Sequence, residues 1–186
     1  DVSEYRNYLA ITGAYWAFTL TDGALRMLVL LYLHEEGYTP VGIASLFLFY
    51  EFFGIVTNLV GGWLGARFGL KSTLFSGLLL QVGALSILAW QADALSMPLV
   101  MLVQAASGIA KDLTKMSSKS YLKFVIGANQ PSRLLKWVAI LTGSKNTLKG
   151  VGFFLGGLLL TTVGFAVACQ AMAIVLAAVL LLVGLL

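Results

Sequence analysis

The feature that most constrains the fold is a series of six apolar stretches separated by short polar turns. A transmembrane helix needs about 20 mainly apolar residues, so 186 residues leave room for about six of them. Only 11% of the residues are charged, less than half of the roughly 25% found in soluble domains. We therefore predict an all-α integral membrane bundle of six transmembrane helices, covering about residues 8–33, 40–64, 73–90, 98–115, 133–163 and 165–186.

Lysine and arginine are distributed unevenly among the turns. Arg67 and Lys71 follow the second stretch, and further basic residues lie between the fourth and the fifth, whereas the turns after the first, third and fifth stretches carry none. Short basic loops remain on the cytoplasmic side of a membrane. We therefore expect a multi-pass plasma membrane protein in a lipid bilayer, with both ends in the cytoplasm. The loops also account for the net charge of +4, so we expect no nucleic-acid partner.

Seven of the charged side chains inside the stretches bear on a possible site, because a charge at the bilayer centre costs at least about 2.5–3.5 kcal/mol on insertion scales. Asp22 and Arg26 are four residues apart and share one helical face with Tyr15 and Thr19. Cations exceed anions by one, so a cavity built from these residues would favour an anion and leave a carboxylate able to take a proton. The seven are Asp22, Arg26, Glu51, Lys111, Asp112, Lys145 and Lys149.

Each of these interpretations has a structural alternative. Asp22 and Arg26 can form a static ion pair, and Glu51 can be a neutral, hydrogen-bonded acid. The lysines that follow the fourth stretch are interpreted as topological signals whose long side chains reach the membrane interface. These lysines are Lys115, Lys119 and Lys123.

Glycines recur every four residues in two of the stretches. This spacing lets helices approach closely, and it also lets them slide or hinge. The glycines are Gly61, Gly65 and Gly69 in the second stretch, and Gly152 and Gly156 in the fifth, with Gly157 beside them.

Motifs of enzyme active sites are missing from the sequence. The single His34 has no partner histidine for a metal site, and there is no nucleophile elbow or phosphate-binding glycine loop. We therefore expect no enzymatic activity, no cofactor and no metal.

The turn after the second stretch has the pattern Gly-x-x-x-x-Arg-x-Gly-x-Lys. With this turn, six spans and both ends inside, the chain resembles the amino-terminal half of a major facilitator superfamily transporter. The signature of that family at this turn is Gly-x-x-x-Asp-Arg/Lys-x-Gly-Arg/Lys-Arg/Lys. Ala66 and Leu70 depart from that signature. The resemblance implies that residues 1–186 are one six-helix domain of a longer transporter, completed by a second six-helix half or by a homodimer partner. It places a conformational gate at Gly62, Arg67, Gly69 and Lys71.

Residues 20–31, 46–65 and 141–150 are similar to the organoarsenical efflux permeases of the ArsJ type. This resemblance implies proton-coupled efflux of 1-arseno-3-phosphoglycerate, a small anionic substrate, across a bacterial inner membrane. The alternatives are a major facilitator exporter of another organic anion or a drug, and a non-transporting scaffold or half-transporter subunit. We expect substrate contacts from Arg26, Asn58, Lys111, Lys145 and Lys149, and proton coupling by Asp22 and Glu51.

Overall fold

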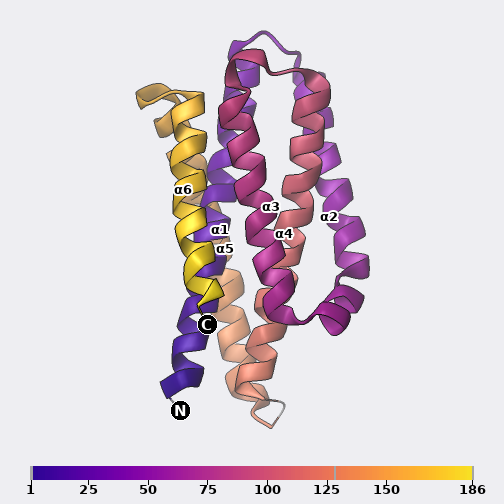
Figure 1. Cartoon of the computed structure of the whole chain (residues 1–186), viewed down its shortest axis with the longest axis vertical. Coiled ribbons are helices and arrows are strands. Elements are labelled where there is room, and N and C mark those ends of the chain that lie inside the picture. Colours follow the sequence, from indigo (N-terminus) through magenta and orange to yellow (C-terminus); the bar gives the residue numbers. More distant parts are fainter. Residues whose placement is uncertain (1, 128, 186) are drawn as a thin grey trace.

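The computed structural model describes residues 2–127 and 129–185, which form an all-helical bundle (Figure 1). The predicted all-α class is therefore confirmed. A short 3₁₀ turn at Ala92–Ala94 precedes the fourth helix. The six α-helices are α1 (Val2–Glu35), α2 (Pro40–Phe68), α3 (Leu70–Trp90), α4 (Met97–Ile126), α5 (Pro131–Thr162) and α6 (Phe165–Gly184).

Four of these helices are long and apolar enough to cross a membrane, over Tyr5–Glu35, Pro40–Phe68, Leu70–Trp90 and Phe165–Gly184. Helices α4 and α5 have 30 and 32 residues but do not meet the same criterion. Charged side chains occupy the second half of α4, from Lys111 onward, and the first part of α5, up to Lys149. The described chain is thus a helical bundle with four candidate membrane spans, not the six predicted. The sixth predicted stretch ended at Leu186, which lies outside the described residues.

The helix boundaries follow from local sequence. A proline occupies the first or second position of α2, α4 and α5, where its missing N–H costs no helical hydrogen bond. Thr39 caps α2, because its side chain accepts a hydrogen bond from the Gly42 N–H at 3.1 Å. Gly69 separates α2 from α3 with φ of 86°, a backbone conformation that glycine adopts without a steric penalty.

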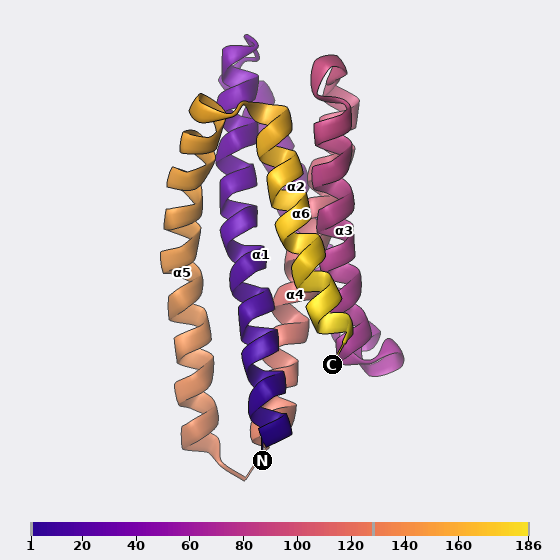
Figure 2. The same cartoon turned by 60° about the vertical axis from the view of Figure 1, so that its left-hand side comes forward.

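The helices pack side by side along one common direction (Figures 1 and 2). Helix α1 contacts α4, α5 and α6, while α4 also contacts α2 and α3, and α3 contacts α6. Both chain ends, the turn between α2 and α3, and the facing ends of α4 and α5 lie at the same end of the bundle. The basic residues of the predicted cytoplasmic turns therefore gather at one end.

Small residues bring two helix pairs into backbone contact. A Cβ atom added to Gly156 of α5 would collide with the backbone of Ala24 in α1, and one added to Gly23 of α1 would collide with the carbonyl of Lys149 in α5. The predicted role of the α5 glycines in close helix packing is therefore confirmed.

The second backbone contact joins α2 to α4. A Cβ atom on Gly108 of α4 would collide with the carbonyl of Tyr50, and one on Gly54 of α2 would collide with the Asp112 carboxylate. Further along the same interface, Gly61 packs against Met116. The two crossings place the charged residues of the four helices opposite one another.

Candidate functional site

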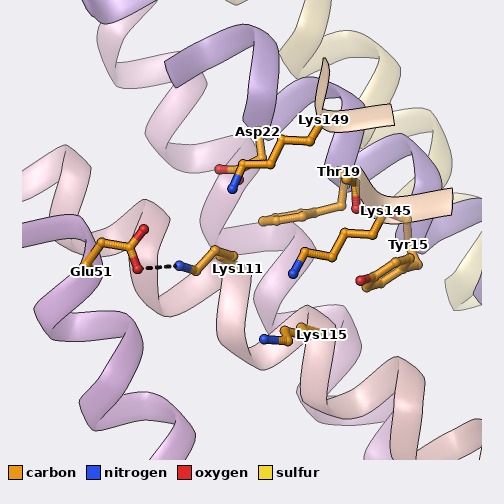
Figure 3. A pocket seen from close by; sticks show the side chains of 9 residues that line it. Tyr15, Thr19, Asp22, Glu51, Lys111, Lys115, Lys145 and Lys149 are labelled. Carbon is orange, nitrogen blue, oxygen red and sulfur yellow. Dashed lines mark hydrogen bonds and ion pairs between the residues drawn. The ribbon is translucent and has the colours of Figure 1, made fainter. Parts of the chain in front are cut away.

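A polar cavity of about 240 Å³ opens between α1, α2, α4 and α5 (Figure 3). Pockets for drug-sized ligands hold about 300–1,000 Å³, so this cavity fits a smaller molecule. Helices α3 and α6 contribute none of its lining residues. The lining comprises Tyr15, Phe18, Thr19, Asp22, Glu51, Lys111, Lys115, Lys145 and Lys149.

The cavity brings together five of the seven residues predicted for substrate contact or proton coupling. The polar face predicted for the first stretch forms its α1 wall, through Tyr15, Thr19 and Asp22. Lys115, interpreted from sequence as a topological signal, lines the cavity instead, because it lies one helical turn from Lys111 on α4. The other predicted residues in the lining are Glu51, Lys145 and Lys149.

Two predicted substrate contacts lie outside the lining. Asn58 is exposed on α2 and is not part of the cavity wall. Arg26 is not among the lining residues either, and it contacts the site through its ion pair with Glu51.

The Glu51 carboxylate bridges cations from two other helices. Its Oε1 lies 3.1 Å from Nη2 of Arg26 on α1, and its Oε2 lies 3.1 Å from Nζ of Lys111 on α4. The side chain of Glu51 is 51% exposed, whereas those of Arg26 and Lys111 are 21% and 22% exposed. In the part of the chain that the structure describes, Arg26 therefore pairs with Glu51, not with Asp22 as one sequence interpretation supposed.

Tyr50 is a site residue that the sequence analysis missed. Its side chain is 1% exposed, and its hydroxyl donates a hydrogen bond of 2.7 Å to Oδ2 of Asp22. The Arg26 guanidinium carbon and the Lys111 ammonium each lie 4.4 Å from the centroid of its ring, within cation–π range. Tyr50 thus contacts both cations and the buried carboxylate. No sequence signal separates it from the other aromatic residues of the second stretch.

The other three lysines of the cavity form no ion pair with a carboxylate among the described residues. Among the described residues, no carboxylate oxygen lies within 4.0 Å of the ammonium groups of Lys115, Lys145 and Lys149. Figure 3 shows these ammonium groups directed into the same space. Charges in apolar surroundings interact more strongly than in water, so this space attracts an anion.

The charge balance of the site is positive. Its cations come from α1, α4 and α5, and its carboxylates from α1, α2 and α4. Asp112, which is 7% exposed, adds a carboxylate whose Oδ2 lies 3.8 Å from Nζ of Lys111. When every charged side chain of the site is ionised, the cations exceed the carboxylates by two. The set comprises the cations Arg26, Lys111, Lys115, Lys145 and Lys149 and the carboxylates of Asp22, Glu51 and Asp112.

The residues predicted to form a gate lie apart from this cavity, at the turn between α2 and α3. All four are exposed, and the Arg67 guanidinium lies over the rings of Trp63 and Phe68, at 5.4 and 5.7 Å from their centroids. Across residues 2–127 and 129–185, no group of three or more His, Cys, Asp or Glu side chains could hold a metal ion. The gate residues are Gly62, Arg67, Gly69 and Lys71.

The sequence matches no model of a known protein family, and no curated protein matches it. The resemblance to the major facilitator superfamily and to the organoarsenical permeases therefore stays a prediction.

Proposed function

We propose that this chain is one half of a secondary transporter for a small organic anion, with the polar cavity as the substrate site. The observation that carries the proposal is the convergence of Lys115, Lys145 and Lys149 without a carboxylate partner among the described residues. Ionisable residues within membrane segments face cavities or the bundle interior, and they mark substrate pathways. Ammonium groups directed into one space would bind phosphoryl, arsenyl or carboxylate oxygens.

In this proposal α4 and α5 also cross the membrane, which restores six spans. Both exceed the about 20 residues that a span needs. The charges that lower their apolar character include four lysines of the cavity lining, so these side chains would be shielded from lipid. The end of the bundle that carries both termini and the basic turns would face the cytoplasm. The four are Lys111, Lys115, Lys145 and Lys149.

A second six-helix half, or a second copy of the chain, would close the site. The cavity lies between α1, α2, α4 and α5, and apolar side chains on α2 and α5 remain uncovered, such as Phe52 (58% exposed) and Phe154 (74% exposed). In secondary transporters built from repeats, the substrate lies near the midplane between two such halves. A major facilitator arrangement would therefore place the partner over this face.

We further propose proton-coupled export of 1-arseno-3-phosphoglycerate from the bacterial cytoplasm. The support is the sequence resemblance of residues 20–31, 46–65 and 141–150, together with a small cavity that has an excess of cations. A three-carbon molecule with two strongly anionic groups matches that size and charge. Asp22 or Glu51 would change protonation during the cycle.

The test is ligand-dependent thermal stability of the purified chain in detergent, with 3-phosphoglycerate plus arsenate as ligand. A ligand that binds only the folded state raises the melting temperature. We expect Lys149→Gln to abolish that rise, because it removes one of the three converging ammonium groups. Lys123→Gln removes the same charge from an exposed position outside the cavity and should retain the rise. Equal ligand stabilisation in the two variants would contradict the assignment, and no ligand effect in wild type would favour a non-transporting scaffold.

A further inference from the structure

The Glu51 carboxylate lies at a position suited to an anionic group of a ligand. We infer that Glu51 is an internal placeholder, which a second anionic group of the substrate displaces from Arg26 and Lys111. The inference rests on the proposed function and narrows the substrate class to molecules that carry two anionic groups. One group would contact the three converging lysines, and the other would take the place of Glu51.

The first argument is the geometry of the bridge. Each carboxylate oxygen of Glu51 contacts a different cation, at 3.1 Å, and these cations belong to α1 and α4. A carboxylate or phosphoryl group of a ligand also has at least two acceptor oxygens, so it can form the same two charge-assisted hydrogen bonds. The subsite is therefore defined by Arg26 and Lys111, and any suitable oxyanion can fill it.

The second argument is the difference in burial across the bridge. The two cations are about one fifth exposed and lie against the ring of the buried Tyr50, whereas Glu51 is 51% exposed. Both cations are thus more buried than the carboxylate that they bind, so the carboxylate is the more accessible partner of the bridge. Ion pairs with this much exposure are weak, so a ligand can replace the carboxylate at little cost.

Asp22 provides the contrast within the same cavity. It is 6% exposed, and its Oδ2 accepts the hydrogen bond from Tyr50. Displacing Asp22 would leave a buried hydroxyl without its acceptor, so Asp22 stays in place when a ligand enters. The two carboxylates therefore have different roles, although both line the cavity.

The third argument concerns the position of Lys111. Its ammonium group contacts Glu51, and it lines the same cavity as Lys115, Lys145 and Lys149 (Figure 3). Lys111 therefore connects the two subsites, and a small ligand in this cavity can reach both through it. Such a ligand also supplies negative charge to a site with a positive excess.

The experiment compares two ligands by calorimetric titration of the full chain in detergent. One is 3-phosphoglycerate, which has a phosphate and a carboxylate, and the other is glycerol 3-phosphate, which has only the phosphate. We expect Glu51→Gln to tighten 3-phosphoglycerate binding by about tenfold, because its carboxylate no longer competes with Glu51. Asp22→Asn is the charge control, because it removes one negative charge but leaves Glu51 bound to Arg26 and Lys111. For glycerol 3-phosphate, Glu51→Gln should tighten binding no more than Asp22→Asn does.

A second variant gives an independent readout that needs no phosphate. Glu51→Ala empties the subsite, so acetate should bind to Glu51→Ala and raise its melting temperature, with no effect on wild type. If Glu51→Gln tightens the binding of both phosphate ligands equally, and acetate has no effect on Glu51→Ala, then Glu51 is not a placeholder. The proposed function would remain intact. No binding of either phosphate ligand to wild type or to any variant would overturn both.

Discussion

The hydroxyl of Tyr50 offers a direct test of how the site is held together. Tyr50→Phe removes only this oxygen and keeps the ring that Arg26 and Lys111 contact. The lost interaction is the hydrogen bond of 2.7 Å to Oδ2 of Asp22, and both side chains are almost fully buried. The change therefore leaves the Asp22 carboxylate without this buried donor.

The size of the effect follows from the charge of the acceptor. Hydrogen bonds to charged groups contribute about 1.5–3 kcal/mol, compared with about 0.5–1.5 kcal/mol for neutral pairs. At roughly 2–4 °C per kcal/mol for a chain of this length, Tyr50→Phe should lower the melting temperature by about 3–12 °C. Tyr32→Phe is a matched control, because the Tyr32 hydroxyl donates to the neutral carbonyl of Ala92 at 3.1 Å.

The assay is thermal unfolding of wild type, Tyr50→Phe, Tyr32→Phe, Asp22→Asn and the Asp22→Asn and Tyr50→Phe double variant in the same detergent. We expect Tyr50→Phe to lower stability more than Tyr32→Phe does. The double variant should be more stable than the sum of the single effects implies, because Asp22→Asn already removes the charge that strengthens the hydrogen bond from Tyr50. A loss for Tyr50→Phe no larger than that for Tyr32→Phe, with additive effects in the double variant, would refute the reasoning.

Two further predictions concern packing and buried polar groups. Gly156→Ala should lower the free energy of unfolding by about 1–3 kcal/mol, because the new Cβ meets the backbone of Ala24, while Gly157→Ala should change it by less than about 0.5 kcal/mol. Equal losses in these two variants would contradict the backbone contact. Ser107→Ala should cost about 1–3 kcal/mol in thermal or denaturant unfolding, because it leaves the buried Oε1 of Gln81 without its donor at 2.8 Å, and no loss would show that the bond is not formed.

Much of the fold can be predicted from the sequence, because apolar length and helix-start residues act locally. Pro40 and Pro131 are the first residues of α2 and α5, and Gly69 lies at the turn where the apolar pattern is interrupted. The number of membrane spans, in contrast, depends on more than local sequence. Helices α4 and α5 carry the four lysines that line the cavity, and only the packing of the other helices around them reveals this. Composition alone does not distinguish a helix that lines such a cavity from a polar surface helix.

Contacts between helices decide which of the predicted site residues the cavity brings together. The four-residue spacing correctly placed Lys145 and Lys149 on one face, since both line the cavity. Asn58 lies seven residues after Glu51, a spacing that keeps it on nearly the same helical face but about 10 Å further along the helix axis. Spacing along one helix therefore predicts a shared face, whereas the reach of the cavity along the axis depends on the other helices.

The glycines and the charged residues, treated separately in the sequence, belong to one arrangement in the structure. Gly23 contacts the backbone of Lys149, and Gly108 contacts the backbone of Tyr50, so each close crossing coincides with the level of the charged side chains. A bulkier residue at Gly108 would push α4 away from α2 and lengthen the ion pair between Lys111 and Glu51. One at Gly23 would push α5, and with it Lys149, away from α1. The geometry of the charges thus depends on residues that carry none, which explains why charge spacing within single helices could not predict the ion pairs between them.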